Sequence, residues 1–429
     1  MSKPSLTVVL PTKREAANLE WLFGALHEAL DDRVDELDIL VVDTPTDDGT
    51  EELCAKHGTR YIGDESLGFA DALRRGFQES KHELVMTMDA DGSHNPLYIR
   101  WMLNEINTCD LVICSRYVAR GGQEASAFRY LTSLVLNWWV GSVCSMPIRD
   151  LSGGFKMYRR EVLQEINLDS SGFEIQCEIA INTFGHGFRI HEIPFCYHPR
   201  LEGRSKAAVI KYGMAFLFGS LRLRRYRNSR EFCDYDDRAY RSRIPMQQWW
   251  QRSRYQKMIG LLKPNGVTLD VGCGSGRIII GWPKVIGIDL NINILRYLRH
   301  EERTVVHADA QALPIAKDSV DTLFCCEVAE HLPADTPLFD EIARVLKPGG
   351  RALITTPDYG APWWPSIEWL YELLLPPAAG HEHLTHYKRK TLEEALTSRG
   401  LNVVSYDRMA GSILFLLVEK PAVTPEDDG

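Results

Sequence analysis

Apolar strand-like runs alternate with amphipathic helical patterns in two separate stretches of the chain. The first stretch contains "LTVVLPT", "LDILVVDT", "RYIGDE" and "LVMTMD", and a helical pattern from about 15 to 30 separates the first two runs. The second contains "VTLDVGCG", "KVIGIDLN", "TVVHADA", "VDTLFCCEV" and "GRALITTP". Strands that alternate with helices form mostly parallel sheets with helical crossovers. The sequence therefore predicts two α/β domains, which suits a length of 429 residues.

The boundary between the two domains is predicted where the strand pattern is lost. Residues 228–255 are polar and aromatic, "NSREFCDYDDRAYRSRIPMQQWWQRSRY". We predict a first domain over 1–230, a linker over 231–255, a second domain over 256–420 and a disordered tail over 421–429.

Composition limits the partners and the cell compartment. A formal net charge of −9 argues against a protein whose bulk surface binds nucleic acid. The ten cysteines include no Cys-x-x-Cys pair, so they suggest neither a zinc site nor a disulfide framework and favour a reducing compartment. The N-terminus lacks the apolar core of a secretory signal, and no run reaches the roughly 20 apolar residues that span a bilayer. We expect a cytoplasmic protein, either soluble or peripheral on the cytoplasmic membrane face, whose oligomeric state stays open.

Carboxylates follow two of the predicted strands in the first domain. Asp43 ends "LDILVVD", and Asp89 and Asp91 form a D-x-D pair after "LVMTM". In parallel sheets, ligands collect at the carboxyl ends of the strands. Two carboxylates at this spacing can hold Mg²⁺ or Mn²⁺, which neutralises a diphosphate. The pair alone is weak evidence, because surface turns are rich in aspartate.

Six motifs in order make this interpretation specific. They are "VVLPTKREAANL", "VVDTPTDDGT", "DADGSHNP", "SRYVARGG", "RDLSGGFKMYRREVL" and "IPFCYHPRLEGRSK". Residues 5–230 thereby resemble the inverting nucleotide-sugar glycosyltransferases of the dolichol-phosphate mannose synthase type. The resemblance implies a glycosyltransferase A-type fold and a GDP- or UDP-sugar donor.

The resemblance also implies roles for individual residues. Pro11, Glu15 and Asp43 would contact the nucleotide, while Asp89 and Asp91 would bind the metal and the sugar diphosphate. Four basic residues would receive phosphates, with solvated surface charge as the alternative for each: Arg116, Arg129, Arg200 and Lys206. The sequence departs from the family in having Lys13 and Arg14 before Glu15, and Ser93 after the D-x-D acids. The base and the third metal contact are therefore left open.

The acceptor can be argued partly from chemistry. A hydroxyl acceptor needs a general base, whereas a lipid phosphate is already ionised near neutral pH and needs positioning by basic residues. "RYLTSLVLNWWVGSV" and "KYGMAFLFGSLRLRRYR" are apolar and aromatic, and the second ends in Arg222, Arg224, Arg225 and Arg227. Such segments suit a membrane surface; the alternative is packing in the core or at a dimer interface. We favour a polyprenyl phosphate acceptor over a glycan.

The second domain begins with a glycine-rich strand end, "LDVGCGSGR". Asp270 precedes Gly272 and Gly274, which let the backbone approach a ligand closely. Asp289 ends the next strand 19 residues later, where it can accept both ribose hydroxyls. This pairing alone also fits a dinucleotide.

The following motifs discriminate between these ligands. "HADAQALPIAKDSVDTLFCCEVAEHL" and "EIARVLKPGGRALITTPD" resemble class I S-adenosylmethionine-dependent methyltransferases, which have a Rossmann-like fold, over about residues 255–420. By this resemblance Asp270, Gly272 and Gly274 would hold the methionine part, and Asp289 the ribose. Asp309 and Ala310 would meet the adenine, and Glu327 through His331 the acceptor. His331, His381, His383 and His386 are candidate bases, and the aromatic stretch 361–377 is a candidate lid, core helix or membrane contact.

The leading hypothesis is a bifunctional enzyme that transfers a sugar from a nucleotide sugar and methylates a related product. Fusion raises the local concentration of the second active site around a shared product. Two alternatives remain. One is a soluble enzyme that glycosylates and methylates a glycan or a secondary metabolite, and the other is a protein in which one domain is catalytically silent and senses its cofactor.

Overall fold

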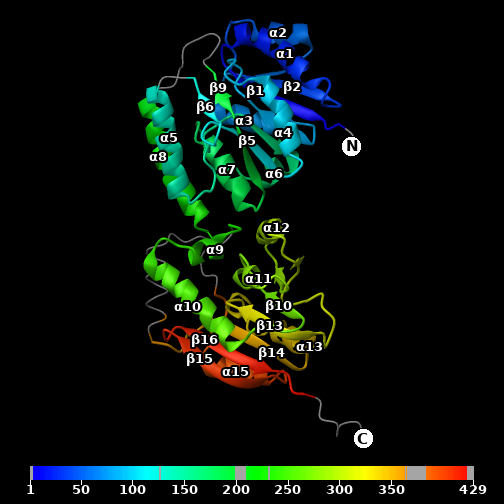
Figure 1. Cartoon of the computed structure of the whole chain (residues 1–429), viewed down its shortest axis with the longest axis vertical. Helices are drawn as coiled ribbons and strands as arrows, with labels where there is room; N and C mark the ends of the chain where they lie inside the picture. The colour runs from blue at the N-terminus through cyan, green and yellow to red at the C-terminus, as the bar shows by residue number, and fades with distance from the viewer. Residues whose placement is uncertain are drawn as a thin grey trace. The chain divides into compact units, whose positions relative to one another are not determined.

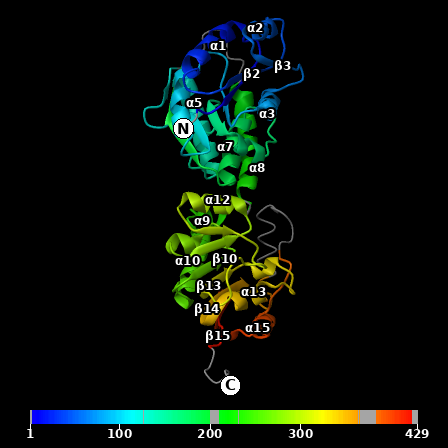
Figure 2. The same cartoon turned by 90° about the vertical axis from the view of Figure 1, so that its right-hand side faces the viewer.

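The computed structural model describes residues 3–124, 127–198, 209–229, 232–362, 364 and 383–422; along residues 127, 129 and 209–215 it describes the backbone alone. The chain divides into two compact units, Met1–Arg227 and Asn228–Gly429 (Figure 1, Figure 2). Most of the aromatic stretch 361–377 and of the predicted tail lies outside the described residues.

The first unit is built on a seven-stranded sheet in the order β3-β2-β1-β4-β7-β5-β8. Paired strands run parallel, except that β7 is antiparallel to both β4 and β5. The strands are β1 (Leu6–Thr12), β2 (Leu37–Asp43), β3 (Arg60–Gly63), β4 (Leu84–Thr87), β5 (Leu111–Ser115), β7 (Lys156–Arg159) and β8 (Ile190–Pro194), and β6 (Gly122–Gln123) pairs separately with β9 (Cys196–Tyr197). Because β1 lies between β2 and β4, the carboxyl ends of these three strands share one edge of the sheet.

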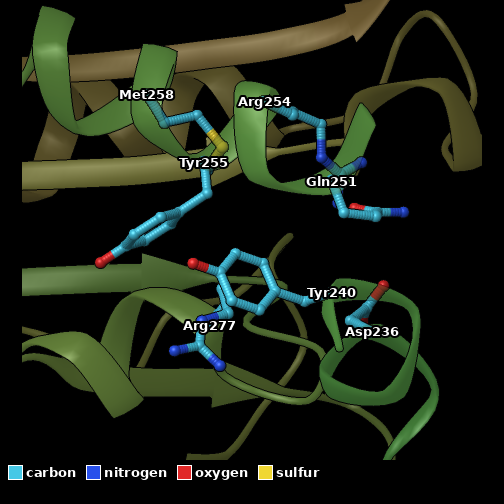
Figure 3. Close-up of a pocket in the computed structure, with 7 residues that line it drawn as sticks. All are labelled: Asp236, Tyr240, Gln251, Arg254, Tyr255, Met258 and Arg277. Carbon is cyan, nitrogen blue, oxygen red and sulfur yellow. The ribbon is translucent and has the colours of Figure 1, made fainter. Parts of the chain in front are cut away.

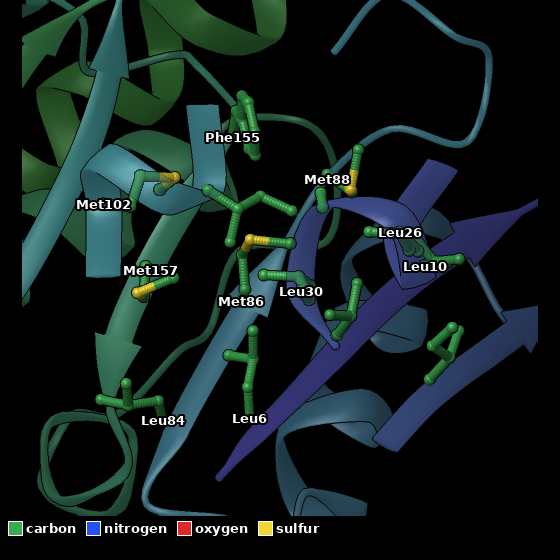
Figure 4. Packing of buried hydrophobic residues seen from close by; sticks show 14 of the residues in the cluster. Leu6, Leu10, Leu26, Leu30, Leu84, Met86, Met88, Met102, Phe155 and Met157 are labelled. Atoms are coloured by element: carbon green, nitrogen blue, oxygen red, sulfur yellow. The ribbon is translucent and has the colours of Figure 1, made fainter. Parts of the chain in front are cut away.

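Helices bury both faces of this sheet. On one face Leu6 and Leu10 of β1 pack with Leu26 and Leu30 of α1 and with Met86 of β4 (Figure 4). On the other face Val9 of β1 belongs to a second apolar cluster, which includes Ala72 of α3. Burial on both faces explains the continuous apolar runs of the central strands. The helices are α1 (Ala16–Leu30), α2 (Thr50–His57), α3 (Phe69–Glu79), α4 (Ile99–Glu105), α5 (Ala127–Val143), α6 (Arg160–Glu165), α7 (Ile175–Gly185) and α8 (Val209–Arg227), with a 3₁₀ turn η1 (Pro96–Tyr98) before α4.

The second unit has its own seven-stranded sheet, in the order β12-β11-β10-β13-β14-β16-β15. The first five strands run parallel, and β16 is antiparallel to both β14 and β15. The strands are β10 (Thr268–Val271), β11 (Ile286–Asp289), β12 (Val305–His307), β13 (Val320–Cys326), β14 (Leu346–Pro357), β15 (Asn402–Met409) and β16 (Ile413–Glu419). The helices are α9 (Tyr235–Tyr240), α10 (Pro245–Leu261), α11 (Arg277–Gly281), α12 (Ile292–His300), α13 (Leu338–Val345) and α15 (Arg389–Thr397), with a 3₁₀ turn η2 (Ala329–His331) after β13.

Both units are mixed α/β sheets, so the predicted fold class is confirmed. The segment 231–255 differs from its description as a linker, because it forms α9 and most of α10 inside the second unit. The sequence of α10 is polar because Met258 is the one residue that this helix buries. Among the described residues, none of the helices combines the length and apolar content that crossing a bilayer requires.

Candidate active sites

The D-x-D loop follows β4 at the shared carboxyl edge of the first sheet. The Asp91 side chain is buried, at 3% exposure, and its Oδ1 accepts the backbone N–H of Ser93 at 3.0 Å and the Ser93 hydroxyl. Gly92 between them has φ +78°, a conformation that favours glycine. The Asp89 side chain is 37% exposed. The turn therefore fixes one carboxylate, while the other is accessible to a ligand.

His94, which sequence reasoning did not single out, forms a hydrogen bond with the backbone of this loop. Its ring is buried and stacks on Phe155 at 4.8 Å between centroids, and its Nδ1 accepts the backbone N–H of Asp89 at 2.9 Å. Burial lowers the pKa of His94, although the Asp89 and Asp91 carboxylates act in the opposite direction. A neutral imidazole suits an Nδ1 that accepts a hydrogen bond. The signal in the sequence was a histidine three residues after Asp91.

Asp43 lies at the same edge, at the end of β2. Its side chain is fully buried; Oδ1 accepts the Thr12 hydroxyl at 2.8 Å and Oδ2 the Tyr61 hydroxyl at 3.4 Å. Burial raises the pKa of Asp43. Pro11 of β1 pairs with Val42 of β2, the residue before Asp43. Glu15 lies just before α1, and its side chain accepts a hydrogen bond from the Asn18 amide at 2.7 Å. Thus the edge brings Pro11 and Asp43 together.

Arg116 forms a buried ion pair with Asp150. Its Nε and Nη2 donate to the two carboxylate oxygens at 2.8 and 2.7 Å, and its backbone N–H donates to Oδ2 at 3.0 Å. Burial alone would raise the pKa of Asp150, but the contacts from Arg116 hold it below its ordinary value. The predicted role of Arg116 in phosphate binding stays a prediction, and the structure adds Asp150 as its partner.

Replacing Asp150 by Asn should strongly destabilise the first unit. The variant leaves the buried Arg116 charge without a counter-ion, which costs about 3–5 kcal/mol. The measurement is the denaturant midpoint of the full chain. Asp71→Asn is the matched control, because Asp71 pairs with Arg74 while half exposed, and such pairs are worth about 1 kcal/mol or less. Equal shifts in the two variants would contradict the assignment of a buried pair.

The remaining predicted phosphate-binding residues are only partly described. Arg200 and Lys206 lie outside the described residues, and Arg129 belongs to α5 without a described side chain. Sequence reasoning missed a different buried cation, Lys156 on β7. Its Nζ donates to the backbone oxygen and Oε1 of Gln176 at 2.7 and 2.9 Å, and burial lowers its pKa to about 8. Gln176 lies close to the D-x-D loop, because its side chain and that of Asp89 are both 3.5 Å from the position a Cβ on Gly154 would take. Lys156, which donates to Gln176, is therefore near this loop as well.

Helices α5 and α8 pack against each other (Figure 1), and the Trp139 indole N–H donates to the Ser220 hydroxyl at 3.2 Å. Both helices carry exposed apolar side chains, together called the exposed apolar face of α5 and α8: Phe128, Leu131, Val135 and Trp138 on α5, and Leu217, Phe218 and Leu221 on α8.

The four arginines at the end of α8 do not share one environment. Arg227 was predicted at the membrane surface, and this is corrected: it is fully buried, and its Nε donates to the backbone oxygen of Cys144 at 3.1 Å. Arg222 pairs with the buried Glu178 at 3.2 Å. Arg224 and Arg225 are exposed. The sequence pattern could not separate them, because the burial of Arg227 depends on the distant turn after α5.

The second site is the glycine turn after β10. The backbone N–H groups of Gly272 and Cys273 donate to the Ile288 oxygen at 2.8 and 3.0 Å, and Gly274 N–H donates to Asp289 Oδ2 at 2.9 Å. A Cβ on Gly272, whose φ is +67°, would lie 2.3 Å from Val328 Cγ2. The turn that contains Gly272 and Gly274 is therefore held against Asp289, the last residue of β11.

Asp236 on α9 is a member of this site that sequence reasoning missed. Its backbone N–H donates to the Ser275 hydroxyl at 2.9 Å, and its Oδ2 accepts the Ser275 N–H at 3.3 Å. Asp236 also lines a pocket beside the turn (Figure 3), in which the Arg277 guanidinium lies 4.0 Å from the centroid of the Tyr240 ring. The pocket is lined by Asp236, Tyr240, Gln251, Arg254, Tyr255, Met258 and Arg277. The segment expected to be a linker thus supplies one wall of the second site.

Asp270, at the end of β10, is buried beside two other carboxylates. Burial raises its pKa to about 8, and the negative charges of Asp289 and Asp236 act in the same direction. Such a group favours a positively charged ligand, which would compensate the ionised carboxylate.

The remaining predicted residues of the second site lie at neighbouring strand ends. Asp309 follows β12, and its Oδ1 accepts the Gln311 N–H at 2.9 Å; Ala310 packs against the core. Glu327 follows β13 with φ +57°, and its Oε1 accepts the Thr355 hydroxyl at 2.9 Å. Of the candidate bases, His331, His383 and His386 are described and His381 is not.

Comparison with known proteins separates the two halves of the chain in the same way. Residues 7–167 match the family Glycosyl transferase family 2, and residues 269–354 match a methyltransferase domain.

The relatives that match the N-terminal half include two at 31% and 32% identity. The chain is 31% identical over 246 residues to undecaprenyl-phosphate mannosyltransferase of Micrococcus luteus, covering 50% of this chain and 97% of that protein. It is 32% identical over 219 residues to polyprenol monophosphomannose synthase of Mycolicibacterium smegmatis, covering 46% of this chain and 79% of that protein. Among solved structures, the match to glucosyl-3-phosphoglycerate synthase from Mycobacterium tuberculosis covers 52% of this chain and 80% of the synthase chain, with 20% sequence identity and a TM-score of 0.41.

Proposed function

Because the chain belongs to glycosyl transferase family 2 through its N-terminal half and carries a methyltransferase domain in its C-terminal half, we propose that it is a bifunctional transferase. The first unit transfers a sugar from a GDP or UDP sugar to polyprenyl phosphate. The second methylates a related product with S-adenosylmethionine. The observation that carries the first activity is the meeting of Asp43 and the D-x-D loop at one sheet edge, in a chain whose relatives are named for lipid-phosphate mannosyl transfer.

A divalent cation fits the D-x-D loop. Asp89 and Asp91 offer only oxygen ligands, which Mg²⁺ and Mn²⁺ prefer, and Ser93 fixes the orientation of the buried carboxylate. A cation bound there would partly neutralise the negative charge of the donor diphosphate. Asp43 and Pro11 would hold the nucleotide, with Glu15 at the start of α1 beside them.

The acceptor phosphate would supply its own nucleophile. One of its oxygens forms the new bond to the anomeric carbon as the bond to the nucleoside diphosphate breaks, which inverts the configuration there. Arg116 and the family-matched Arg129, Arg200 and Lys206 would position the phosphate, and no strong base is required. A hydroxyl acceptor would need such a base.

The exposed apolar face of α5 and α8 would contact the membrane that contains the lipid acceptor. Phe128, Trp138 and Phe218 are 72%, 66% and 62% exposed, so the face could bury large apolar side chains at the boundary between headgroups and acyl chains. Arg224 and Arg225 lie at the end of the same helix pair. The location proposed for the protein is therefore peripheral, on the cytoplasmic face of the membrane.

Changing Arg224 and Arg225 together to Gln should weaken binding to anionic vesicles by about thirtyfold at low salt, because each basic residue near the surface contributes about 1 kcal/mol. Co-sedimentation measures this. The control is the double change Arg389→Gln and Lys390→Gln on α15, which removes the same charge elsewhere. If both double variants bind the vesicles equally well, α8 does not contact the membrane through these arginines.

S-adenosylmethionine fits the second site because its charges suit the buried carboxylates. Its sulfonium and ammonium groups are cationic, and Asp270 and Asp236 lie around the glycine turn that would meet the methionine part. Asp289 would accept the ribose hydroxyls, Asp309 and Ala310 would meet the adenine, and Glu327 would face the acceptor. The bound group would supply the methyl, and these residues would hold it.

Binding of S-adenosylmethionine near pH 7 should release a proton. With a pKa of about 8, Asp270 is mostly protonated in the free protein, and a cationic ligand favours its ionised form. Affinity should rise as the pH increases from 6 toward 8. Calorimetry in two buffers of different ionisation enthalpy measures the proton, and Asp270→Asn is the control that should abolish it. Identical heats in both buffers would contradict this linkage.

Mass spectrometry of lipid extracts incubated with labelled nucleotide sugar and labelled S-adenosylmethionine tests the proposed pair of activities. A lipid-linked product that carries both labels is expected. Sugar transfer with no methylated product in any fraction would contradict the bifunctional proposal and favour a catalytically silent second unit. Labelled soluble glycans without labelled lipid would favour the soluble alternative.

A further inference from the structure

Three side chains of the second unit, two of them the candidate bases His331 and His383, form a cluster to which the proposed function assigns no role. Glu330, His331 and His383 each place one potential ligand atom so that the three atoms lie within 4.8 Å of one another. Two of them come from η2, directly after β13, and the third from a segment more than 50 residues later in the sequence. We propose that this cluster binds a divalent transition metal of the Zn²⁺ or Co²⁺ type.

The contacts around the cluster orient its side chains for this role. Glu330 is 1% exposed, and its Oε2 accepts the Thr356 hydroxyl at 3.1 Å. The Tyr359 hydroxyl lies 2.6 Å from His383 Nδ1. Metal-binding histidines are commonly held by a hydrogen bond at the second ring nitrogen, and metal-binding carboxylates are also hydrogen-bonded. In the metal-bound state His383 would therefore use Nε2.

The two segments are also tied together through their backbones. The Thr385 N–H donates to the Glu330 oxygen at 3.0 Å, and its hydroxyl donates to the Leu332 oxygen at 2.6 Å. The Tyr359 N–H donates to the Tyr387 oxygen at 3.0 Å. The two Thr385 bonds hold the segment that bears His383 against the turn that bears Glu330 and His331, and the Tyr359 bond ties the same segment to the end of β14. Less reorganisation is then needed to bind an ion.

The donor set indicates the class of metal. Two imidazoles and one carboxylate suit Zn²⁺ and neighbouring transition ions, whereas Mg²⁺ and Ca²⁺ prefer oxygen ligands alone. The proposed metal at Asp89 and Asp91 therefore differs in chemistry as well as in unit. Three protein ligands leave a coordination position for water or for an oxygen of a bound molecule, as in catalytic metal sites.

The position of the cluster suggests which bound molecule would fill the open coordination position of the metal. Strands β10 and β13 are parallel neighbours, so η2 follows β13 at the sheet edge where the glycine turn follows β10. If the proposed methyltransferase function is correct, a role that rests on it follows: the metal would bind an oxygen of the methyl acceptor. Metal binding itself does not depend on that function.

Titration of the full-length protein with Co²⁺ tests the site. Tetrahedral or five-coordinate Co²⁺ with imidazole ligands absorbs visible light far more strongly than octahedral Co²⁺ bound by oxygen alone, so the signal separates this cluster from the D-x-D loop. We expect one strongly absorbing ion per chain, and an unchanged signal in Asp91→Asn. His331→Gln and His383→Gln should each lose most of the absorption. His191→Gln is the matched control, because His191 also contacts a carboxylate, Glu105, at 2.6 Å, but in a pair in the first unit.

Each outcome of this experiment decides the proposal. A wild-type protein without the strong bands would overturn it, and this result does not depend on whether the variants fold. Bands that survive in both His331→Gln and His383→Gln would also overturn it, because the ion would then lie elsewhere. Calorimetry with S-adenosylmethionine on the same samples is independent: absent cofactor binding with intact Co²⁺ bands would contradict the methyltransferase proposal and leave the metal site in place.

Discussion

Replacing Asp91 by Asn is expected to lower sugar transfer by about a thousandfold or more. A divalent cation supplies several kcal/mol of charge stabilisation, and each 1.36 kcal/mol is worth tenfold in rate. The substitution is a clean one, because the Asn side-chain oxygen can still accept the Ser93 N–H and so preserve the turn. Only the charge is removed. Affinity for S-adenosylmethionine should not change, since the glycine turn belongs to the other unit.

Asp64→Asn is the matched control for this measurement. Asp64 follows β3 and accepts the N–H and hydroxyl of Ser66 through Oδ1, as Asp91 does with Ser93, but it is exposed. Its variant should keep its activity. The readout is kcat/KM for labelled nucleotide sugar, with and without a chelator. Full activity of Asp91→Asn, or a wild-type rate that the chelator leaves unchanged, would remove the metal from the proposed mechanism.

Gly272→Val is expected to weaken binding of S-adenosylmethionine by at least about a hundredfold, or about 3 kcal/mol. A side chain at φ +67° costs about 1–2 kcal/mol. Beyond that strain, its Cβ would collide with Val328 at 2.3 Å and shift the turn, whose Gly274 N–H donates to Asp289. Calorimetry on the purified variant measures the loss.

The control is Gly349→Val. Gly349 has φ +78° but nothing within 4 Å of its Cβ position, so its variant has comparable backbone strain without the collision. It should lower the melting temperature and leave the affinity intact. Unchanged affinity in Gly272→Val, or equal losses in the two variants, would contradict the assignment of the cofactor site to this turn.

The strand-end carboxylates and the glycine turn could be predicted because their positions follow from local pattern. An apolar run that stops at Asp43, or at Asp270 before the glycines, marks the carboxyl end of a strand, and parallel topology then gathers such ends. Both family resemblances are confirmed by the matches to the two families. The pairing of the two activities and the methyl acceptor remain proposals.

What the sequence did not reveal depends on contacts between distant residues. Asp150 pairs with Arg116 across 34 residues, and Arg227 is buried against the turn after α5, 82 or more residues away. No local pattern reports such contacts. Helix α9 was taken as part of a linker because its six residues are mostly polar, yet Asp236 reaches Ser275 of the glycine turn.

Transfer of labelled sugar to a defined acceptor is the decisive measurement for the proposed function. The full-length protein is given a labelled nucleotide sugar and, in separate reactions, polyprenyl phosphate, polyprenol or a free glycan. We expect label in the polyprenyl phosphate product alone, with a rate that persists down to about pH 6, where a phosphate monoester takes up its second proton. Transfer to polyprenol or to the glycan, with polyprenyl phosphate inert, would contradict the lipid-phosphate acceptor.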